Sequence, residues 1–360
     1  MSVADPTILT KLSAGRLFQT YKRYRTLQTH RITSLPIAVL MPHSACNCRC
    51  VMCDIWKDNR NLKQLTETDI RGLLDTFKQL GTGQILMSGG EALLNPNFFR
   101  FCEILKSQGL RISLLSTGLA LKQHKENLLQ WVDDIIVSLD GDEALHDQIR
   151  NVPGAFKKLK EGVQDLKAVK PDYRITARTV IHQLNFKHWP EIIDSALSIG
   201  LDQLSFLPAD VGSHAFNRQQ VWGYDRQQEI CIAQNDLAEL ESIIDRLLID
   251  YNSLFASRFI AESPAKMRHI HGYYRALHGL QEFPYKKCNA PWVSAVVEAD
   301  GTVRPCFFHE VIGNIREESL GKVLNNENAF RFRKTLSIDD NPTCKQCVCY
   351  LNLPPGANLK

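Results

Sequence analysis

The stretch CNCRCVMC, residues 46–53, places four cysteines within eight positions, shortly after an apolar run that ends at Met41. Three of them, Cys46, Cys50 and Cys53, have the spacing C-x3-C-x2-C. Three thiolates held this close can bind three irons of a cubane cluster and leave the fourth iron open. An open iron separates a catalytic cluster from an electron carrier, so the spacing indicates chemistry at a metal. A zinc site is the alternative interpretation of the spacing alone.

Around these cysteines, short apolar runs alternate with segments of helical periodicity from about residue 36 to residue 208. The predicted strands are residues 35–41, 85–87, 112–115, 135–139, 174–181 and 203–207. Thr66 and Asp69 are spaced as a capping box at the start of a predicted helix that Gly81 ends. Strands that alternate with helices form parallel sheets with right-handed crossovers. Six such units predict an α/β fold, a partial (β/α)6 barrel open on one side, with its site at the carboxyl ends of the strands.

Polar residues stand at the expected ends of three of these strands. The segment Gly89-Gly90-Glu91 follows the second strand, where glycines let the backbone approach a ligand closely and Glu91 adds a carboxylate. Ser116 ends the third strand. Ser138 and Asp140 end the fourth, and residues two apart on a strand point the same way. We therefore expect both to face the interior of the barrel.

Three further residues, Arg178, His146 and Arg150, carry side chains whose orientation the sequence does not decide. Arg178 lies on the fifth predicted strand, and a guanidinium fork matches the geometry of a carboxylate. An outward-facing side chain is the alternative for this arginine. His146 and Arg150 follow the fourth strand, and we predict that they form a surface salt-bridge and capping cluster.

A second group of cysteines lies near the end of the sequence and comprises Cys288, Cys306, Cys344, Cys347 and Cys349. The valine-rich segments 293–297 and 301–303 predict a β-hairpin, which brings Cys288 close to Cys306. The pair Cys344-x2-Cys347 then closes a four-thiolate site. Cys349 in place of Cys347 is the alternative fourth ligand, and a zinc ribbon is the alternative for the whole segment.

The whole chain has 360 residues and a net charge of +4, which is too small to indicate nucleic-acid binding. No apolar run approaches 18 residues and no signal peptide is apparent, so no membrane span is expected. Eleven cysteines in such a chain indicate metal or redox chemistry in a reducing compartment, the cytoplasm. The predicted organisation is an amphipathic helical segment (1–35), the barrel core (36–209), a helical connector over the open site (210–285) and a small β-hairpin and helix domain (286–350).

The cysteine run, the Gly-Gly-Glu segment and the Ser138/Asp140 pair together resemble the radical S-adenosylmethionine (radical SAM) enzymes. The resemblance implies that Cys46, Cys50 and Cys53 hold a [4Fe-4S] cluster whose free iron chelates the methionine part of SAM. It assigns Gly89-Gly90-Glu91 to the amino group of SAM. The other expected contacts of SAM are Ser116, Ser138, Asp140 and Arg178. The C-terminal cysteines resemble the SPASM or shortened twitch extension, which implies one auxiliary [4Fe-4S] cluster on Cys288, Cys306, Cys344 and Cys347.

This resemblance also implies a reaction. The reduced cluster donates one electron to SAM, and the resulting 5′-deoxyadenosyl radical removes hydrogen from an unactivated C–H bond. A flavodoxin- or ferredoxin-type protein is the implied reductant, and the auxiliary cluster is expected to transfer electrons. We expect a small metabolite as the substrate of an oxidation, with a precursor-peptide side chain as the alternative. An iron–sulfur electron carrier is the alternative of another class, against which the SAM-pocket motifs argue.

Overall fold

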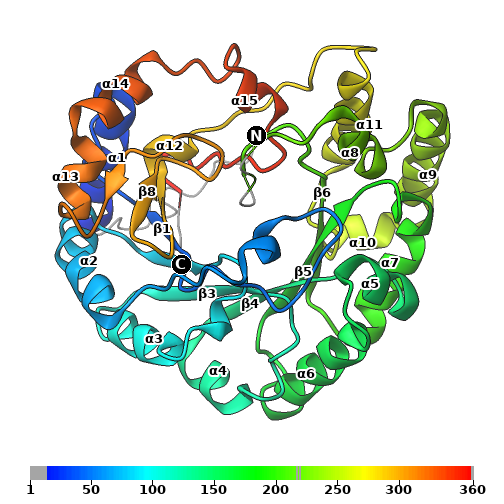
Figure 1. The fold of residues 1–360 in the computed structure, drawn as a ribbon, viewed down its shortest axis with the longest axis horizontal. Helices are drawn as coiled ribbons and strands as arrows, with labels where there is room; N and C mark the ends of the chain where they lie inside the picture. The colour runs from blue at the N-terminus through cyan, green and yellow to red at the C-terminus, as the bar shows by residue number, and fades with distance from the viewer. Residues whose placement is uncertain (1–13, 216–217, 219, 358–360) are drawn as a thin grey trace, which may run out of the picture.

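The computed structural model describes residues 14–215, 218 and 220–357, which form one open sheet with helices around its outer face (Figure 1). The order of its nine strands is β6-β5-β4-β3-β2-β1-β7-β8-β9. The strands are β1 Ile37–Leu40, β2 Gln84–Met87, β3 Arg111–Ser116, β4 Asp134–Ser138, β5 Ile175–Ile181, β6 Gln203–Pro208, β7 Ser294–Val297, β8 Thr302–Arg304 and β9 Gly313–Asn314. All pairings from β6 to β7 are parallel, and β7-β8 and β8-β9 are antiparallel. The predicted α/β partial barrel is confirmed.

The helices follow the strands in the order that the sequence predicts, and α2, α3, α4, α6 and α7 surround the arc of strands (Figure 1). Their bounds are α1 Ala14–Thr29, α2 Glu67–Leu80, α3 Phe98–Lys106, α4 Lys125–Trp131, α5 Glu143–Arg150, α6 Ala155–Val169, α7 Trp189–Ile199, α8 Tyr224–Ile230, α9 Leu237–Asp250, α10 Asn252–Ala256, α11 Pro264–Leu277, α12 Ala290–Val293, α13 Leu320–Asn325, α14 Glu327–Thr335 and α15 Pro342–Gln346. None of these described helices combines the length and the apolar character that crossing a membrane requires.

The first helix of the barrel shows how local sequence sets the boundaries of an element. The Thr66 hydroxyl accepts a hydrogen bond from the Asp69 backbone amide, and the Asp69 carboxylate accepts one from the Thr66 amide at 2.9 Å. This is the predicted capping box, which satisfies amides that the first helical turn leaves open. Gly81 ends the helix with φ +65°, a left-handed conformation that glycine adopts without strain.

The C-terminal hairpin continues the barrel sheet. β7 pairs in parallel with β1 along all four of its residues, and the Met41 amide donates to the Val297 carbonyl at 2.9 Å. The predicted hairpin is confirmed as β7 and β8, but its union with β1 was not visible in the sequence. The pairing fixes the C-terminal cysteine segment against the strand that leads into residues 46–53.

The two remaining predicted segments lie at the ends of the arc. α1 contacts the rest of the chain through Lys22, which donates to the Gln79 carbonyl at 2.6 Å, and through Arg23, which donates to the Ala357 carbonyl at 2.7 Å. The first thirteen residues of the predicted segment 1–35 lie outside the described residues. In the connector, α9 buries its apolar face and packs against α11.

Candidate functional site

The cysteine run forms a loop directly after β1. Cys50 is buried, whereas Cys46 and Cys53 are partly buried. The side chain of Asn59 holds the loop by accepting from the Cys46 amide at 3.0 Å and donating to the Cys46 carbonyl at 2.8 Å. The Trp56 indole donates to the Cys50 carbonyl at 3.3 Å. These contacts order the backbone that carries the three thiols.

A buried ion pair lies directly beside this loop. Arg150 Nη1 donates to Cys50 Sγ at 3.4 Å, and Arg150 Nη2 pairs with the carboxylate of Asp140. Asp140 has no exposed surface and also accepts from the Val180 amide at 3.2 Å. The His146 ring is buried as well, and its Nδ1 accepts from the Asp140 amide at 3.2 Å. The prediction of a surface cluster at His146 and Arg150 is therefore wrong, because α5 turns both side chains inward toward the cysteine loop.

The thiols of the loop differ in their electrostatic surroundings. A hydrogen bond from Cys48 lowers the pKa of Cys50 to about 6. The charge of Arg150 also lowers this pKa, whereas burial of the thiol raises it. Burial raises the pKa of Cys53 to about 12. Cys50 is thus the thiol that the chain itself prepares as a thiolate, which is the form that binds iron.

The Gly-Gly-Glu segment packs directly on the cysteine loop. The Glu91 amide donates to the Ala45 carbonyl at 2.9 Å, and a Cβ atom at Gly90 would lie 2.1 Å from that same oxygen. Gly89 has φ +116°, a conformation that side chains rarely permit, and packs on the backbone of His43. Only glycine fits at residue 90, so a glycine is required there for the end of β2 to pack on the cysteine loop.

The carboxylate of Glu91 is buried and points into the protein. It accepts from the Ser116 hydroxyl at 2.9 Å, from the Thr117 amide and hydroxyl at 2.8 Å each, and from the Leu93 amide at 3.2 Å. The Thr117 hydroxyl also lies 3.0 Å from Oδ1 of Asn47. Glu91 therefore links the ends of β2 and β3 to the cysteine loop, while burial raises the pKa of its carboxyl.

Ser138 and Arg178 occupy the same level on neighbouring strands. The register places Ser138 opposite Arg178 and Arg178 opposite Ser205, so the three side chains share one face of the sheet. Arg178 lines a cavity inside the barrel, which contradicts the outward-facing alternative. Asp140 stands two residues beyond Ser138, but its carboxylate is occupied by Arg150.

The cavity has a volume of about 350 Å³ and lies between strands and C-terminal segments. Its walls come from β4, β5, β6 and α11 and from Cys347 to Tyr350. Lys266 of α11 lies 5.3 Å from the ring centroid of Tyr350, which joins the two walls. Tyr273 of α11 also lines the cavity, whereas Tyr224 and His271 are not among its lining residues.

Part of the connector covers the cysteine loop. The indole of Trp222 donates to Oδ2 of Asp54, next to Cys53, at 2.8 Å. The guanidinium groups of Arg218 and Arg226 lie 3.9 Å and 4.8 Å from the centroid of the Trp222 ring. Arg226 also donates to the Val51 carbonyl. The connector therefore contacts the cysteine loop through residues whose spacing in the sequence does not reveal these contacts.

The C-terminal cysteines come from three segments that the hairpin and α15 bring together: Cys288 before α12, Cys306 after β8, and Cys344 with Cys347 in and directly after α15. Cys306 is close enough to Cys288 and Cys344 for their charges to raise its pKa beyond the effect of burial, and Cys347 is influenced in the same way by Cys349 and Cys306. The Cys347 thiol donates to the Cys349 carbonyl at 3.0 Å, whereas the Cys349 side chain is exposed. In the described part of the chain, no three His, Cys, Asp or Glu side chains converge closely enough for a single metal ion.

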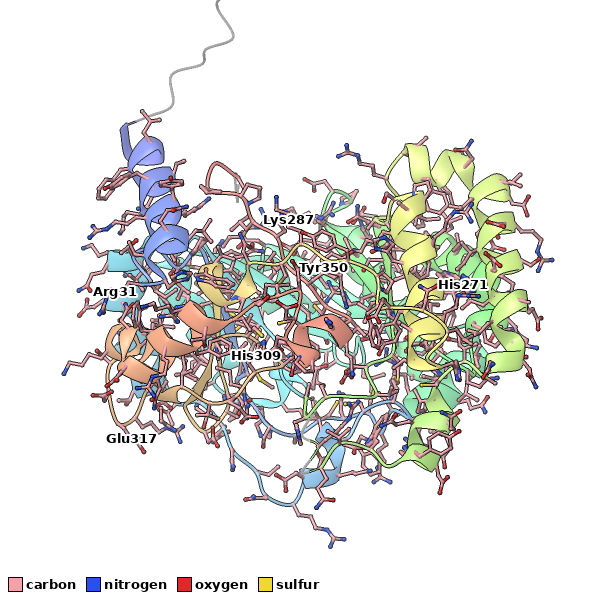
Figure 2. All side chains as sticks on the ribbon, turned by 90° about the horizontal axis from the view of Figure 1, so that it is seen from above. Arg31, His271, Lys287, His309, Glu317 and Tyr350 are labelled. Atoms are coloured by element: carbon pink, nitrogen blue, oxygen red, sulfur yellow. The ribbon has the colours of Figure 1, made fainter. Side chains whose placement is uncertain are left out.

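Two residues beside these cysteines escaped the sequence analysis. Nε2 of buried His309 lies 3.3 Å from Cys344 Sγ, and Figure 2 shows His309 within the C-terminal segments. Lys286 donates to the carbonyls of Lys345 and Cys347 at 2.5 and 2.6 Å. His309 stands three residues after Cys306, and this proximity is the one sequence signal that could have identified it, because a single histidine carries no pattern of its own.

Comparison with known proteins gives two domain matches. Residues 40–196 match the Radical SAM superfamily, and residues 288–348 match SPASM, an iron–sulfur cluster-binding domain. The first match begins at β1 and ends in α7, and the second includes the four C-terminal cysteines.

Similar proteins cover most of the chain at low identity. An AdoMet-dependent heme synthase of Methanosarcina barkeri is 25% identical over 297 residues, which are 80% of this chain and 81% of that protein. A cysteine-type anaerobic sulfatase-maturating enzyme of Clostridium novyi is 23% identical and covers 88% of this chain and 86% of its own. Among solved structures, SuiB of Streptococcus suis bound to its precursor peptide SuiA has a TM-score of 0.65 at 16% identity, over 96% of this chain and 77% of that one.

Proposed function

Because this chain belongs to the radical SAM superfamily and carries a C-terminal SPASM domain, we propose that it removes a hydrogen atom from a C–H bond of a small metabolite and completes an oxidation of that substrate. The core of this superfamily binds a [4Fe-4S] cluster and SAM, and SPASM domains bind auxiliary iron–sulfur clusters. The observation that carries the proposal is the packing of Gly90 and Glu91 on the cysteine loop. An electron carrier needs no such second segment at its cluster.

The residues present fit these groups. Cys46, Cys50 and Cys53 supply the three thiols of the C-x3-C-x2-C spacing, and the thiol of Cys50 is already favoured as a thiolate. Because Gly89 and Gly90 have no side chains, the end of β2 packs directly on the cysteine loop, which brings its peptide groups next to that loop. When bound, the cluster and SAM supply a 5′-deoxyadenosyl radical, the group that takes the hydrogen atom.

The chain contributes position, charge and exclusion of water. Glu91 fixes the ends of β2 and β3 through its four hydrogen bonds. Asp140 holds Arg150 against Cys50, so a positive charge stays beside the thiolates. Trp222 covers the loop from the connector side, which excludes water from the site. The hydroxyl of Ser116 donates its hydrogen bond to Glu91. Ser138 faces the interior of the barrel, where its hydroxyl is available to contact a ligand.

For the C-terminal site we propose one auxiliary cluster on Cys288, Cys306, Cys344 and Cys347. Cys347 is favoured over Cys349 because its thiol is more buried and is influenced by the charge of Cys306. Four protein thiolates leave no open iron, so the role of this site is electron transfer with the substrate. A flavodoxin- or ferredoxin-type donor would supply the electron at the other cluster.

The test is made anaerobically on reconstituted protein by measuring iron, sulfide and 5′-deoxyadenosine formed from SAM with dithionite. We expect about eight irons per chain, the complement of two cubanes, together with deoxyadenosine. Iron without deoxyadenosine would favour an electron carrier and overturn the proposal. About four irons with deoxyadenosine would keep the catalytic proposal and remove the auxiliary cluster.

A second candidate is the modification of a peptide side chain. It is supported by relatives that are named for peptide or protein maturation, such as the sulfatase-maturating enzyme of Clostridium novyi. The metabolite and peptide candidates are distinguished by incubating the reduced enzyme with metabolite pools and, separately, with short precursor peptides encoded nearby. The correct substrate class is the one that raises the rate of deoxyadenosine formation above the substrate-free rate. The mass of the substrate should change in proportion to the deoxyadenosine formed.

A further inference from the structure

The cavity inside the barrel holds more positive charge than its own carboxylates neutralise. Asp134 already accepts two hydrogen bonds from Arg111, at 2.8 and 3.1 Å. Glu262 accepts from the Phe206 amide at 2.9 Å and pairs with Lys266 at 3.2 Å. Both carboxylates that line the cavity are therefore partnered.

Three cations of the same lining have no carboxylate partner among the described residues. Arg174 donates to the neutral amide of Gln203 at 3.0 Å. Lys286 donates to two backbone carbonyls. Arg178 makes no hydrogen bond or ion pair within the described chain, and its Nε is buried without a partner. Arg178 as a whole is partly buried, and its buried Nε is an unsatisfied donor that an anionic ligand would complete.

The position of Arg178 makes it the centre of this charge. It extends from the middle of β5, between Ser138 of β4 and Ser205 of β6, so two hydroxyls share its level. Val180, two residues further along the strand, contacts the Asp140 carboxylate that holds Arg150 at the cysteine loop. Arg178 therefore lies one pleat deeper in the barrel than the groups that touch the loop.

We propose that this cavity binds an acidic group of the substrate, a carboxylate or a phosphate, with Arg178 as its principal contact. The inference rests on the proposed function, because it names the chemical class of the molecule that the enzyme oxidises. A guanidinium fork and the hydroxyl of Ser205, which lines the same cavity, match such an anion in geometry as well as charge. The volume of about 350 Å³ suits a small organic acid or one acidic arm of a larger molecule.

The carboxylate of SAM has the same chemistry, so the experiment must separate the two sources. The reconstituted enzyme is treated with phenylglyoxal, which modifies accessible arginines, and the rate at Arg178 is read by peptide mass spectrometry. The probes are succinate, inorganic phosphate, neutral succinamide and SAM, at ionic strength held constant with NaCl. Arg246 on α9 is exposed and remote from the cavity, so it reports any general effect on the reagent.

We expect succinate and phosphate to slow the modification of Arg178 several-fold, with or without SAM, while succinamide and SAM alone leave it unchanged. Replacing Arg174 by glutamine (Arg174→Gln) should weaken this protection, because it removes a second unpaired charge. Protection by SAM alone would assign Arg178 to the SAM carboxylate and overturn the proposal. Equal rates with every probe, or no modification of Arg178 at all, would also overturn it. Deoxyadenosine formation in the same preparation tests the proposed function separately, since protection requires no turnover.

Discussion

Arg150 Nη1 donates a hydrogen bond to Cys50 Sγ at 3.4 Å while Nη2 of the same side chain pairs with buried Asp140. The segment that follows β4 and the middle of the cysteine loop are thus joined by one guanidinium. Backbone contacts run in parallel, because the Arg49 amide donates to the Arg150 carbonyl and the Val51 amide to the Ile149 carbonyl, both at 3.0 Å. A positive charge held here favours the thiolate form of Cys50. It would also stabilise the negative charge that a cluster bound at the loop gains on reduction.

Replacing Arg150 by methionine should destabilise the protein strongly. The substitution keeps the volume of the side chain but leaves the Asp140 carboxylate buried without its partner, which costs about 3–5 kcal/mol in such pairs. The double variant Arg150→Met with Asp140→Asn removes both charges and should recover most of that loss. The measurement is guanidinium unfolding of the reconstituted protein under argon, with Arg268→Met as the control. Arg268 pairs with Asp245 on the surface, so its loss should cost less than about 1 kcal/mol. Equal costs for the two single variants would contradict a buried role for Arg150.

The three thiols of the loop should account for all cleavage of SAM. The triple variant Cys46→Ala, Cys50→Ala and Cys53→Ala is expected to fall from about eight to about four irons per chain and to form no deoxyadenosine. Cys102→Ala is the matched control, because Cys102 is fully buried on α3 away from the loop and should keep both iron and activity. Deoxyadenosine from the triple variant would remove the catalytic assignment.

The C-terminal thiols should behave in the opposite way. Alanine at Cys306 and Cys344 together is expected to lose about four irons while substrate-free cleavage of SAM continues, since the loop cluster stays intact. Cys349→Ala should keep both clusters, and Cys347→Ala should lose the auxiliary one. The reverse result for these two single variants would make Cys349 the fourth ligand. Zinc found in place of iron would refute a cluster at this site.

Glu91 should affect SAM without affecting iron. In Glu91→Ala the ends of β2 and β3 lose a carboxylate that four donors share, so the adjacent Gly89-Gly90 backbone becomes less ordered. We expect SAM to bind roughly tenfold more weakly, as befits the loss of several buried hydrogen bonds, with an unchanged iron content. Equilibrium dialysis with labelled SAM measures this, and Glu91→Gln, which keeps part of the hydrogen bonding, should lie between wild type and Glu91→Ala. Unchanged SAM affinity in Glu91→Ala would count against its role.

Periodicity and motif spacing predicted the fold where each signal was local. The strand runs, the capping box at Thr66 and the turn at Gly81 depend on neighbouring residues, so the sequence alone contains them. The contacts of Arg150 and His309 depend on which segments the fold brings together, and no spacing encodes that. Arg150 follows Cys50 by one hundred residues, and its position in a helix with other charges favoured a surface interpretation. The union of β7 with β1 is hidden for the same reason, since each strand carries only its own apolar pattern.

The cover over the cysteine loop should slow the loss of its cluster. Trp222→Phe keeps the ring between Arg218 and Arg226 but removes the hydrogen bond to Asp54, which follows Cys53 in the chain. We expect the iron of the loop cluster to reach an added chelator several-fold faster, because the connector is tethered to the loop more weakly. The auxiliary cluster in the same molecule is the internal reference and should lose iron at its wild-type rate. Tyr224→Phe provides the matched variant, since Tyr224 belongs to the same segment and its side chain is 74% exposed. If Trp222→Phe and Tyr224→Phe lose iron equally fast, the contact with Asp54 does not protect the cluster, and the connector covers the loop without shielding it.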